Sequence, residues 1–246
     1  MITLGLCPDT YGEEKSWKFL GIWMKNRWEW TASLIACMFY NITAVGFYDA
    51  MSVEQVDFIL NQTEMRTLVC TGDYASKVVA MKKSGKAVNV TALIVTNEAE
   101  SSLLSSAQEV GIEVHTFASV QQAGEQAQSV SEFVEPTKDD IYIFSYTSGT
   151  TGDSKGVKLS HNNVLTNARC SIPRFQMVPG ECLISYLPYT HSFEQMLFGF
   201  CMMQQLRIGF YSGDPTRIAE DCSILRPHFF PSVPRLYNKI YSRIKG

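Results

Sequence analysis

The sequence has few features of a secreted, membrane-spanning or nucleic-acid-binding protein. Its seven cysteines are odd in number, widely scattered and without a C-x-x-C pair, which argues against a disulfide framework or a zinc site. We therefore expect a reducing compartment, the cytoplasm. No signal peptide precedes the three N-x-T sequons, so we interpret them as chance matches. The net charge of -3 provides no basic field, so nucleic acid is not expected as a partner.

The sequence also lacks a long apolar run. Its most apolar stretch, residues 196–203, is too short to span a bilayer and leads into Gln204, Gln205 and Arg207. A membrane contact would therefore be peripheral, or would depend on sequence outside this chain. The simplest interpretation of the stretch is a buried helix.

What the sequence does contain is an alternation of short β-rich runs and helical patterns over 246 residues. Strands separated by helical segments predict βαβ units and a largely parallel sheet, so the expected fold class is α/β. We expect strands at residues 19–23, 42–47, 68–70, 93–95, 112–117, 141–146 and 157–159. We expect helices at residues 28–40 and 103–110, and further helices after residues 52, 70, 160, 214 and 234. The polar residues 121–131 are expected to form a surface excursion.

Three of the expected helices have recognisable N-terminal capping residues, apolar residues along one face, or both. Residues 52–55 read as a capping box, followed by apolar residues on one helical face: Val56, Ile59 and Leu60. Ser160 is expected to cap the next helix, with an apolar side formed by Val164, Leu165 and Ala168. The helix after Pro234 has a stripe at i, i+4 and i+8, which predicts core packing for Leu236, Ile240 and Ile244.

The sharpest chemical signal is the loop at residues 146–156, which reads Y-T-S-G-T-T-G-D-S-K-G between two expected strands. Its glycines are expected to turn the backbone tightly and to bring N–H groups to a ligand: Gly149, Gly152 and Gly156. Hydroxyls add hydrogen-bond donors at Thr147, Ser148, Thr150 and Thr151. Lys155 adds a positive charge. Composition alone also allows a flexible surface loop, but the lysine among glycines and hydroxyls favours a polyphosphate site.

Two other motifs with similar residue types are the Walker A phosphate loop and the nucleophile elbow of serine hydrolases. It is not a Walker A loop, because Ser154 precedes the lysine and Gly156 follows it. The pattern G-x-S-x-G does fit, with Ser154 as a hydrolase nucleophile and later partners available at Asp214 or Asp221 and His228. A nucleophile elbow lies directly between a strand and a helix, whereas residues 157–159 are an expected strand. The context therefore argues against a serine hydrolase.

At this loop the sequence resembles the adenylate-forming (AMP-binding) superfamily. It matches every fixed position of the signature Y-T-S-G-T-T-G-x-x-K-G, with Ser154 where the family usually has proline. Residues 21–30 resemble the G-x-x-x-x-N-R-x-E-W segment of long-chain fatty acyl-CoA synthetases, and residues 185–194 resemble their S-Y-L-P-x-x-H-x-F-E stretch. Residues 213–214 and 230–240 resemble further segments of the same synthetases, in the same order along the chain. Together these matches favour the long-chain branch of the superfamily.

The resemblance implies ATP-dependent ligation of a fatty acid to CoA through an acyl-adenylate. ATP and CoA would be co-substrates, and Mg²⁺ would be the metal cofactor. Under it, Lys155 and the loop N–H groups would hold the β- and γ-phosphates, and Thr150 or Thr151 would lie near the metal. His191 matches the family's histidine near the acyl site, although a hydrogen-bonded histidine at a helix start is the alternative. Glu194 is expected to be a local structural partner, and residues 196–203 would help to wall an acyl tunnel.

The resemblance also predicts that residues 1–246 form only part of the large N-terminal domain. Members of this family continue with adenine, ribose and magnesium segments and with a small C-terminal domain, none of which is found here. We therefore expect the chain to be inactive alone. The alternative is a non-catalytic ATP- or phosphate-binding or interaction module. The parent enzyme would act in the cytoplasm or at the cytosolic face of the endoplasmic reticulum or another membrane.

Overall fold

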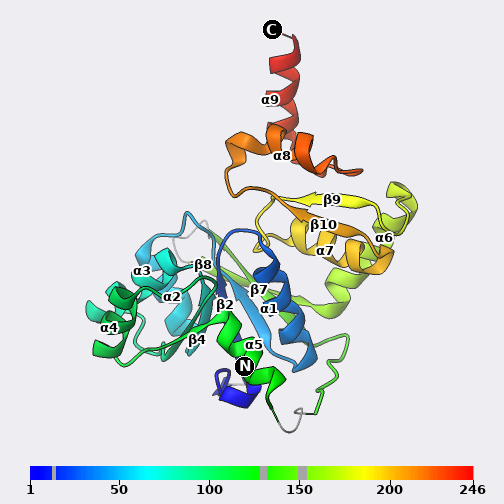
Figure 1. Cartoon of the computed structure of the whole chain (residues 1–246). Helices are drawn as coiled ribbons and strands as arrows, with labels where there is room; N and C mark the ends of the chain where they lie inside the picture. The colour runs from blue at the N-terminus through cyan, green and yellow to red at the C-terminus, as the bar shows by residue number, and fades with distance from the viewer. Residues whose placement is uncertain (13–14, 128–131, 149–153, 246) are drawn as a thin grey trace. The chain divides into compact units, whose positions relative to one another are not determined.

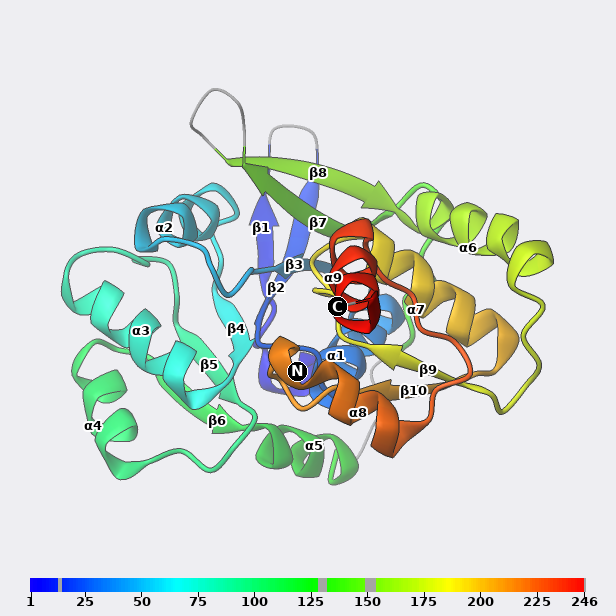
Figure 2. The same cartoon turned by 90° about the horizontal axis from the view of Figure 1, so that it is seen from above.

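The computed structural model describes residues 1–12, 15–127, 132–148 and 154–245 (Figures 1 and 2). The chain divides into two compact units, Met1–Asn163 and Val164–Gly246. We describe each unit by itself. Within the described residues, none of the helices combines the length and the apolar composition that crossing a bilayer requires.

The first unit is built on an eight-stranded sheet. Its strands are β1 (Asp9–Tyr11), β2 (Ser16–Trp23), β3 (Thr43–Gly46), β4 (Thr67–Cys70), β5 (Ala92–Val95), β6 (Glu113–Thr116), β7 (Ile141–Ser148) and β8 (Ser154–Ser160). Their order is β6-β5-β4-β2-β3-β7-β8, with β1 also paired to β2. The pairs from β6 to β7 are parallel, and β1 and β8 are added antiparallel. The prediction of an α/β fold with a largely parallel sheet is confirmed.

Helices cover both faces of this sheet. They are α1 (Trp28–Phe39), α2 (Val53–Gln62), α3 (Gly72–Lys83), α4 (Ser101–Glu109) and α5 (Phe117–Glu125), with a short 3-10 helix, η1 (Ile2–Leu4), near the N-terminus. Both views place α2, α3 and α4 on one face and α1 and α5 on the other (Figures 1 and 2). Because both faces are covered, β3, β4 and β5 are buried at every position.

The centre of the sheet leaves no room for a side chain at Gly21. A Cβ there would lie 2.9 Å from Leu68 Cγ and 3.2 Å from Phe47 Cε2. Both neighbours are buried in the core between the sheet and the helices α2, α3 and α4. Gly21 therefore allows the middle strand, β2, to pack directly beneath these two side chains.

The capping box at the start of α2 is confirmed. The Gln55 N–H donates to Ser52 Oγ at 3.3 Å, and the Ser52 N–H donates to Gln55 Oε1 at 2.9 Å. The apolar residues predicted for one face of this helix, Val56, Ile59 and Leu60, are all fully buried.

The described part of the expected surface excursion, residues 121–127, does lie at the surface, but residues 121–125 are helical and do not form an irregular excursion. Residues 117–125 form α5, so the helix begins where the preceding strand was expected to end. Thr116 Oγ1 caps α5 by accepting from the Ser119 N–H at 3.0 Å. None of the α5 residues is buried, and its apolar positions at helical spacing, Phe117, Val120 and Ala123, are few and lie among polar residues, so the helix signal in the sequence is weak.

The second unit contains a smaller sheet with helices. Its elements are the helix α6 (His161–Phe175), which begins in the first unit, β9 (Cys182–Ser185), α7 (Ser192–Gln204), β10 (Arg207–Phe210), a 3-10 turn η2 (Pro215–Arg217), α8 (Ile218–Leu225) and α9 (Pro234–Lys245). β9 and β10 pair in parallel, and neither was expected from the sequence. Side chains of α7 pack with Leu183 of β9 to form a small core.

One apolar prediction in the later helices is wrong, and another holds for most of its residues. On α6, two of the three residues on the expected apolar side, Val164 and Ala168, are buried, while Leu165 is 46% exposed. On α9, the stripe predicted as core is not core, because Ile244 is 81% exposed while Leu236 and Ile240 are only half-buried. A helical period shows which face is apolar, but it does not show whether another element covers that face. The predicted cap is confirmed, since Ser160 Oγ accepts from the Asn163 N–H at 3.2 Å.

Candidate functional site

The β7–β8 hairpin carries the described ends of the predicted phosphate loop. Gly149, Thr150, Thr151 and Gly152 lie outside the described residues. On either side of them the strands pair antiparallel, with Thr147 opposite Lys155 and Tyr146 opposite Gly156. Opposed residues share one face of a sheet and successive residues alternate. Thr147 and Lys155 therefore lie on one face of the hairpin, where both are exposed, and Tyr146 and Gly156 lie on the other.

Tyr146 is fixed from two directions. Its side chain is only 2% exposed, and its hydroxyl donates to Gln62 Oε1 at 2.7 Å. A Cβ on Gly156 would lie 3.1 Å from Tyr146 Cζ, so the tyrosine ring occupies the space above the glycine. Burial raises the pKa of Tyr146 to about 12, which keeps the phenol protonated as a hydrogen-bond donor at neutral pH.

This geometry corrects the expected backbone role of Gly156. The residue lies inside β8, and its φ is outside the left-handed region, so it does not form a tight turn. Its lack of a side chain instead admits the Tyr146 ring. Its assignment to the phosphate site, like that of Thr147, Ser148 and Lys155, stays a prediction.

The described ends of the loop suit a polyphosphate chemically. An exposed ammonium and an exposed hydroxyl lie opposite one another, and both can donate to phosphate oxygens. The described residues contain no group of three or more His, Cys, Asp or Glu side chains placed to hold a metal ion. A Mg²⁺ ion at such a site would be held largely through the phosphates themselves, and the threonines predicted to contact it lie outside the described residues.

The hydrolase alternative finds no supporting arrangement. Ser154 is buried and begins a strand that continues to residue 160, rather than lying between a strand and a helix. Its proposed partners have local structural roles instead. His228 Nδ1 accepts from the Cys182 N–H at 3.2 Å, while Asp214 and Asp221 accept hydrogen bonds from backbone N–H and hydroxyl groups close to them in the sequence.

His191 lies at the start of α7. Its Nδ1 accepts from the Phe193 N–H at 3.2 Å, which makes it the N-cap of the helix. The side chain is exposed, and in the neutral ring this bond leaves the proton on Nε2. The structure therefore shows His191 as a hydrogen-bonded residue at the start of a helix, which was the alternative interpretation. Its role near the acyl site stays a prediction.

The residues after His191 are buried for most of α7. The apolar stretch is buried from Met196 through Cys201, whereas Met202 is 55% exposed and Met203 is 37% exposed. Glu194 is buried beside this run and accepts a hydrogen bond from the Ser185 hydroxyl. Burial raises its pKa to about 8. These contacts agree with the prediction that Glu194 is a local structural partner.

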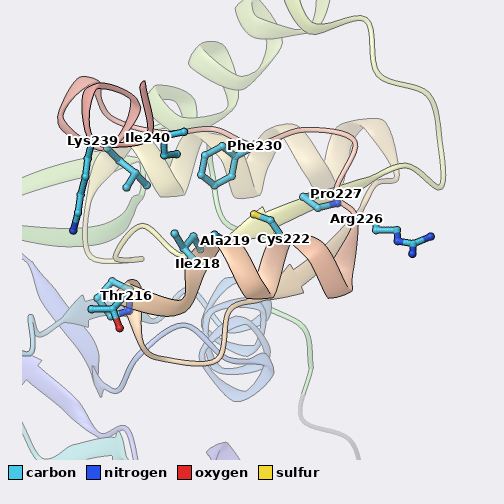
Figure 3. Close-up of a pocket in the computed structure, with 11 residues that line it drawn as sticks. Thr216, Ile218, Ala219, Cys222, Arg226, Pro227, Phe230, Lys239 and Ile240 are labelled. Atoms are coloured by element: carbon cyan, nitrogen blue, oxygen red, sulfur yellow. The ribbon is translucent and has the colours of Figure 1, made fainter. Parts of the chain in front are cut away.

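A cavity that the sequence did not predict lies in the second unit, between α8 and α9 (Figure 3). It has a volume of about 560 Å³ and includes the apolar side chains of Ile218, Phe230 and Ile240. Lys239 and Arg226 lie at opposite ends of the labelled set (Figure 3). Of the predicted phosphate, metal and acyl contacts that lie within the described residues, none lines this cavity. The half-buried part of the α9 stripe forms one of its walls.

The segment at residues 21–30, which contributed to the sequence resemblance, has a structural role. Arg27 donates from Nε and Nη2 to the two carboxylate oxygens of Glu29, each at 2.6 Å. Glu29 is 3% exposed and lies in the first turn of α1. A bidentate pair of this kind fixes the entry into the helix.

Comparison with known proteins places the chain in a family. A sequence model described as AMP-binding enzyme matches residues 15–245. The chain belongs to the AMP-binding enzyme family. The relatives of this AMP-binding chain include the long-chain-fatty-acid–CoA ligase 5 of Mus musculus, which is 32% identical over 99% of the chain and 36% of the relative. They also include the peroxisomal long chain acyl-CoA synthetase 7 of Arabidopsis thaliana, 31% identical over 92% of the chain and 32% of the relative.

The fold agrees with this membership. The A domain of a carboxylic acid reductase from Segniliparus rugosus, solved in complex with AMP and a co-purified carboxylic acid, superposes with a TM-score of 0.80. It is 17% identical, and the match covers 98% of this AMP-binding chain and 41% of that protein. At this identity the likeness supports the fold alone. The chain spans about a third of the length of the curated relatives it matches.

Proposed function

We propose that this chain carries the phosphate-binding part of a long-chain fatty acid–CoA ligase, and that both units belong to the large N-terminal domain of such an enzyme. The observation that carries the proposal is the pairing of Lys155 with Thr147 on one exposed face of the β7–β8 hairpin. Family membership supports the use of ATP, and the long-chain ligases among the relatives support a fatty acid and CoA as the other substrates.

The reaction proposed for the parent enzyme has two steps. A fatty carboxylate oxygen attacks the α-phosphorus of ATP, and the bond to the pyrophosphate oxygen breaks to give an acyl-adenylate. The CoA thiol then attacks the acyl carbonyl, loses its proton and releases AMP. The Lys155 ammonium and the loop N–H groups would stabilise the negative charge that develops on pyrophosphate as it leaves. Mg²⁺ bound to the phosphates would supply further charge neutralisation, with Thr150 or Thr151 offering a hydroxyl oxygen.

For the acyl group we propose the first turn and the buried run of α7. His191 presents Nε2 at the helix start, since Nδ1 is engaged by the helix backbone. An Nε2–H at this position would donate to the fatty carboxylate. The buried apolar side chains that follow would contribute to the wall of an acyl tunnel.

We propose that the chain alone binds phosphate but does not form thioester. Adenylation needs all of its charge-stabilising groups to be held at once, and the chain corresponds to about a third of the relatives. The alternative is a non-catalytic phosphate-binding or interaction module. One experiment distinguishes the ligase hypothesis from this alternative. If the chain is part of a ligase, joining it to the remaining segments of a relative should produce turnover, whereas a non-catalytic module should stay inactive.

The test combines a binding and a catalytic assay. Pyrophosphate binding to the purified chain is measured by calorimetry, and palmitate-dependent CoA-thioester formation is measured with ATP. We expect binding that weakens about tenfold in Lys155→Ala, no thioester from the chain alone, and turnover in the extended protein. No binding of pyrophosphate or ATP would overturn the phosphate assignment. Labelling of Ser154 by a fluorophosphonate would revive the hydrolase alternative.

A peripheral membrane contact at the cytosolic face is also proposed, through α9. This helix has four basic residues and no acidic one, and none of the ion pairs in the described part of the chain involves it. Tyr241 is 60% exposed and Ile244 is 81% exposed. A basic helix with exposed apolar side chains suits an anionic lipid surface. Co-sedimentation with phosphatidylserine vesicles that persists unchanged in Lys239→Glu would contradict this proposal.

A further inference from the structure

We propose that Gln62, Tyr146 and Gly156 form a positioning device that fixes the face of the β7–β8 hairpin on which Lys155 lies. The inference rests on the proposed phosphate-binding role of Lys155. It assigns a function to Gln62, which lies 84 residues before Tyr146 in the sequence and belongs to no motif of the phosphate loop.

The first step of the reasoning concerns strand register. Side chains alternate between the two faces of a strand, so a slip of one residue in the β7–β8 pairing would move Lys155 to the opposite face. Lys155 would then lie on the face where Tyr146 is buried, and Ser154, which is now 8% exposed, would turn outward. The orientation of the proposed phosphate ligand therefore depends on whatever holds this register.

Gly156 and Tyr146 hold the register by shape. They are opposed in the pairing, and the tyrosine ring lies where a side chain on residue 156 would be, with Cζ at 3.1 Å and Cε1 at 3.3 Å from the Cβ position. The neighbouring opposed position, Lys155, carries a long side chain. A slipped register would place a side chain of β8 against this ring, so the ring accepts a glycine as its partner and disfavours the alternatives.

Gln62 holds the ring from the helix side. Its Oε1 accepts from the Tyr146 hydroxyl at 2.7 Å, at the last residue of α2. This end of α2 is itself secured, because the buried Thr63 donates its hydroxyl to the Ile59 carbonyl at 2.7 Å, and Ile59 is fully buried. The backbone of Gln62 is thus attached to the core while its side chain is exposed. Substituting this side chain leaves the core packing intact.

The experiment measures how firmly the β7–β8 pairing is held and how tightly the chain binds pyrophosphate. Amide hydrogen exchange is measured for β7 and β8, and pyrophosphate affinity is measured by calorimetry, in Gly156→Ala, Tyr146→Phe and Gln62→Met. Gly72→Ala and Tyr11→Phe are the matched controls, since a Cβ on Gly72 meets no atom within 4 Å and Tyr11 is 82% exposed. Gln62→Glu restores an acceptor oxygen and serves as the rescue variant.

We expect Gly156→Ala to speed exchange at the Lys155 and Thr147 amides by about tenfold and to weaken pyrophosphate binding by about tenfold, with α3 amides unchanged. Tyr146→Phe and Gln62→Met should each weaken pyrophosphate binding by about threefold. The double variant should bind no more weakly than either single variant, because both substitutions remove the same hydrogen bond. Gln62→Glu should bind as the unmodified chain does.

Three outcomes would count against the device. Uniform acceleration of exchange across the first unit would show a general loss of stability instead of positioning. Unchanged exchange and affinity in Gly156→Ala and Tyr146→Phe would overturn the register argument. Additive effects of Tyr146→Phe and Gln62→Met would show that the two residues do not act through one bond. If the unmodified chain fails to bind pyrophosphate, the phosphate assignment fails, while the exchange data still decide whether the register is held in this way.

Discussion

Replacing Glu194 by glutamine should remove a large part of the pH dependence of stability in the second unit. Glu194 is 2% exposed, accepts from the Ser185 hydroxyl, and has a pKa raised from 4.5 to about 8 by burial. A carboxyl with a raised pKa keeps its proton in the folded state at pH values where the unfolded chain has lost it. The stability that it confers is therefore complete below pH 4.5 and is lost as the pH rises toward 8.

The size of the effect follows from the two pKa values. Between them, each pH unit costs about 1.4 kcal/mol of unfolding free energy. From pH 5 to pH 7.5 the contribution of Glu194 should fall by about 3 kcal/mol, because the full slope is not reached close to either pKa. Glutamine keeps an oxygen to accept from Ser185 and does not titrate. Glu194→Gln should therefore match the unmodified protein at pH 5 and exceed its stability by about 3 kcal/mol at pH 7.5.

The assay must report on the second unit. All four tryptophans lie within residues 17–30, so tryptophan fluorescence reports on the first unit. Hydrogen exchange of buried α7 amides, measured at pH 5 and pH 7.5 and corrected for intrinsic rates, gives the opening free energy where Glu194 lies. Glu98→Gln makes the same change in charge at an exposed position and is the control. Parallel pH curves for the unmodified protein and Glu194→Gln would refute the argument that burial keeps Glu194 protonated.

Three substitutions test other parts of the structure. Gly21→Ala should destabilise the first unit by about 1–3 kcal/mol in urea unfolding followed by tryptophan fluorescence, because its Cβ would lie 2.9 Å from Leu68 Cγ; a neutral effect would mean that the core can shift. Ser52→Ala should cost about 1 kcal/mol in the same assay through loss of the α2 cap, and Ser76→Ala, at an exposed position inside α3, is the control. Ile244→Ser should change the free energy of unfolding by less than about 0.5 kcal/mol, because the side chain is 81% exposed. A loss of several kcal/mol would show that another part of the protein packs over this face of α9.

The parallel sheet was predictable because its central strands β3, β4 and β5 are buried on both faces. Such strands appear in the sequence as short β-branched and apolar runs, as at residues 68–70 and 93–95. Helix α2 was predictable from local chemistry, because the capping box of Ser52 and Gln55 needs only neighbouring residues. α5, β9 and β10 were not predicted. α5 and β10 have no buried residue, so neither appears in the sequence as a buried apolar run. β9 is buried at all four positions, as β4 and β5 are, and was missed although its burial is the same.

The candidate site could be predicted only as far as its residue types. Lys155 and Thr147 were identified from the loop motif, and no property of one segment could show that they are opposed across two strands. The role of Gly156 depends on Tyr146, and that of Tyr146 depends on Gln62 in a distant helix. Interactions between residues far apart in sequence are decided by the fold, and a motif confined to the loop does not contain them.

The position of Lys155 on an edge strand affects how its substitution must be interpreted. β8 is the last strand of the sheet and carries two exposed lysines, Lys155 and Lys158. Charged side chains on an edge strand also discourage pairing with a second sheet. Loss of pyrophosphate binding in Lys155→Ala could therefore follow from association of the chains. Lys158→Ala removes the same charge from the same edge without touching the proposed phosphate face. If this control binds pyrophosphate normally and both variants stay monomeric by light scattering, the loss belongs to the binding role of Lys155.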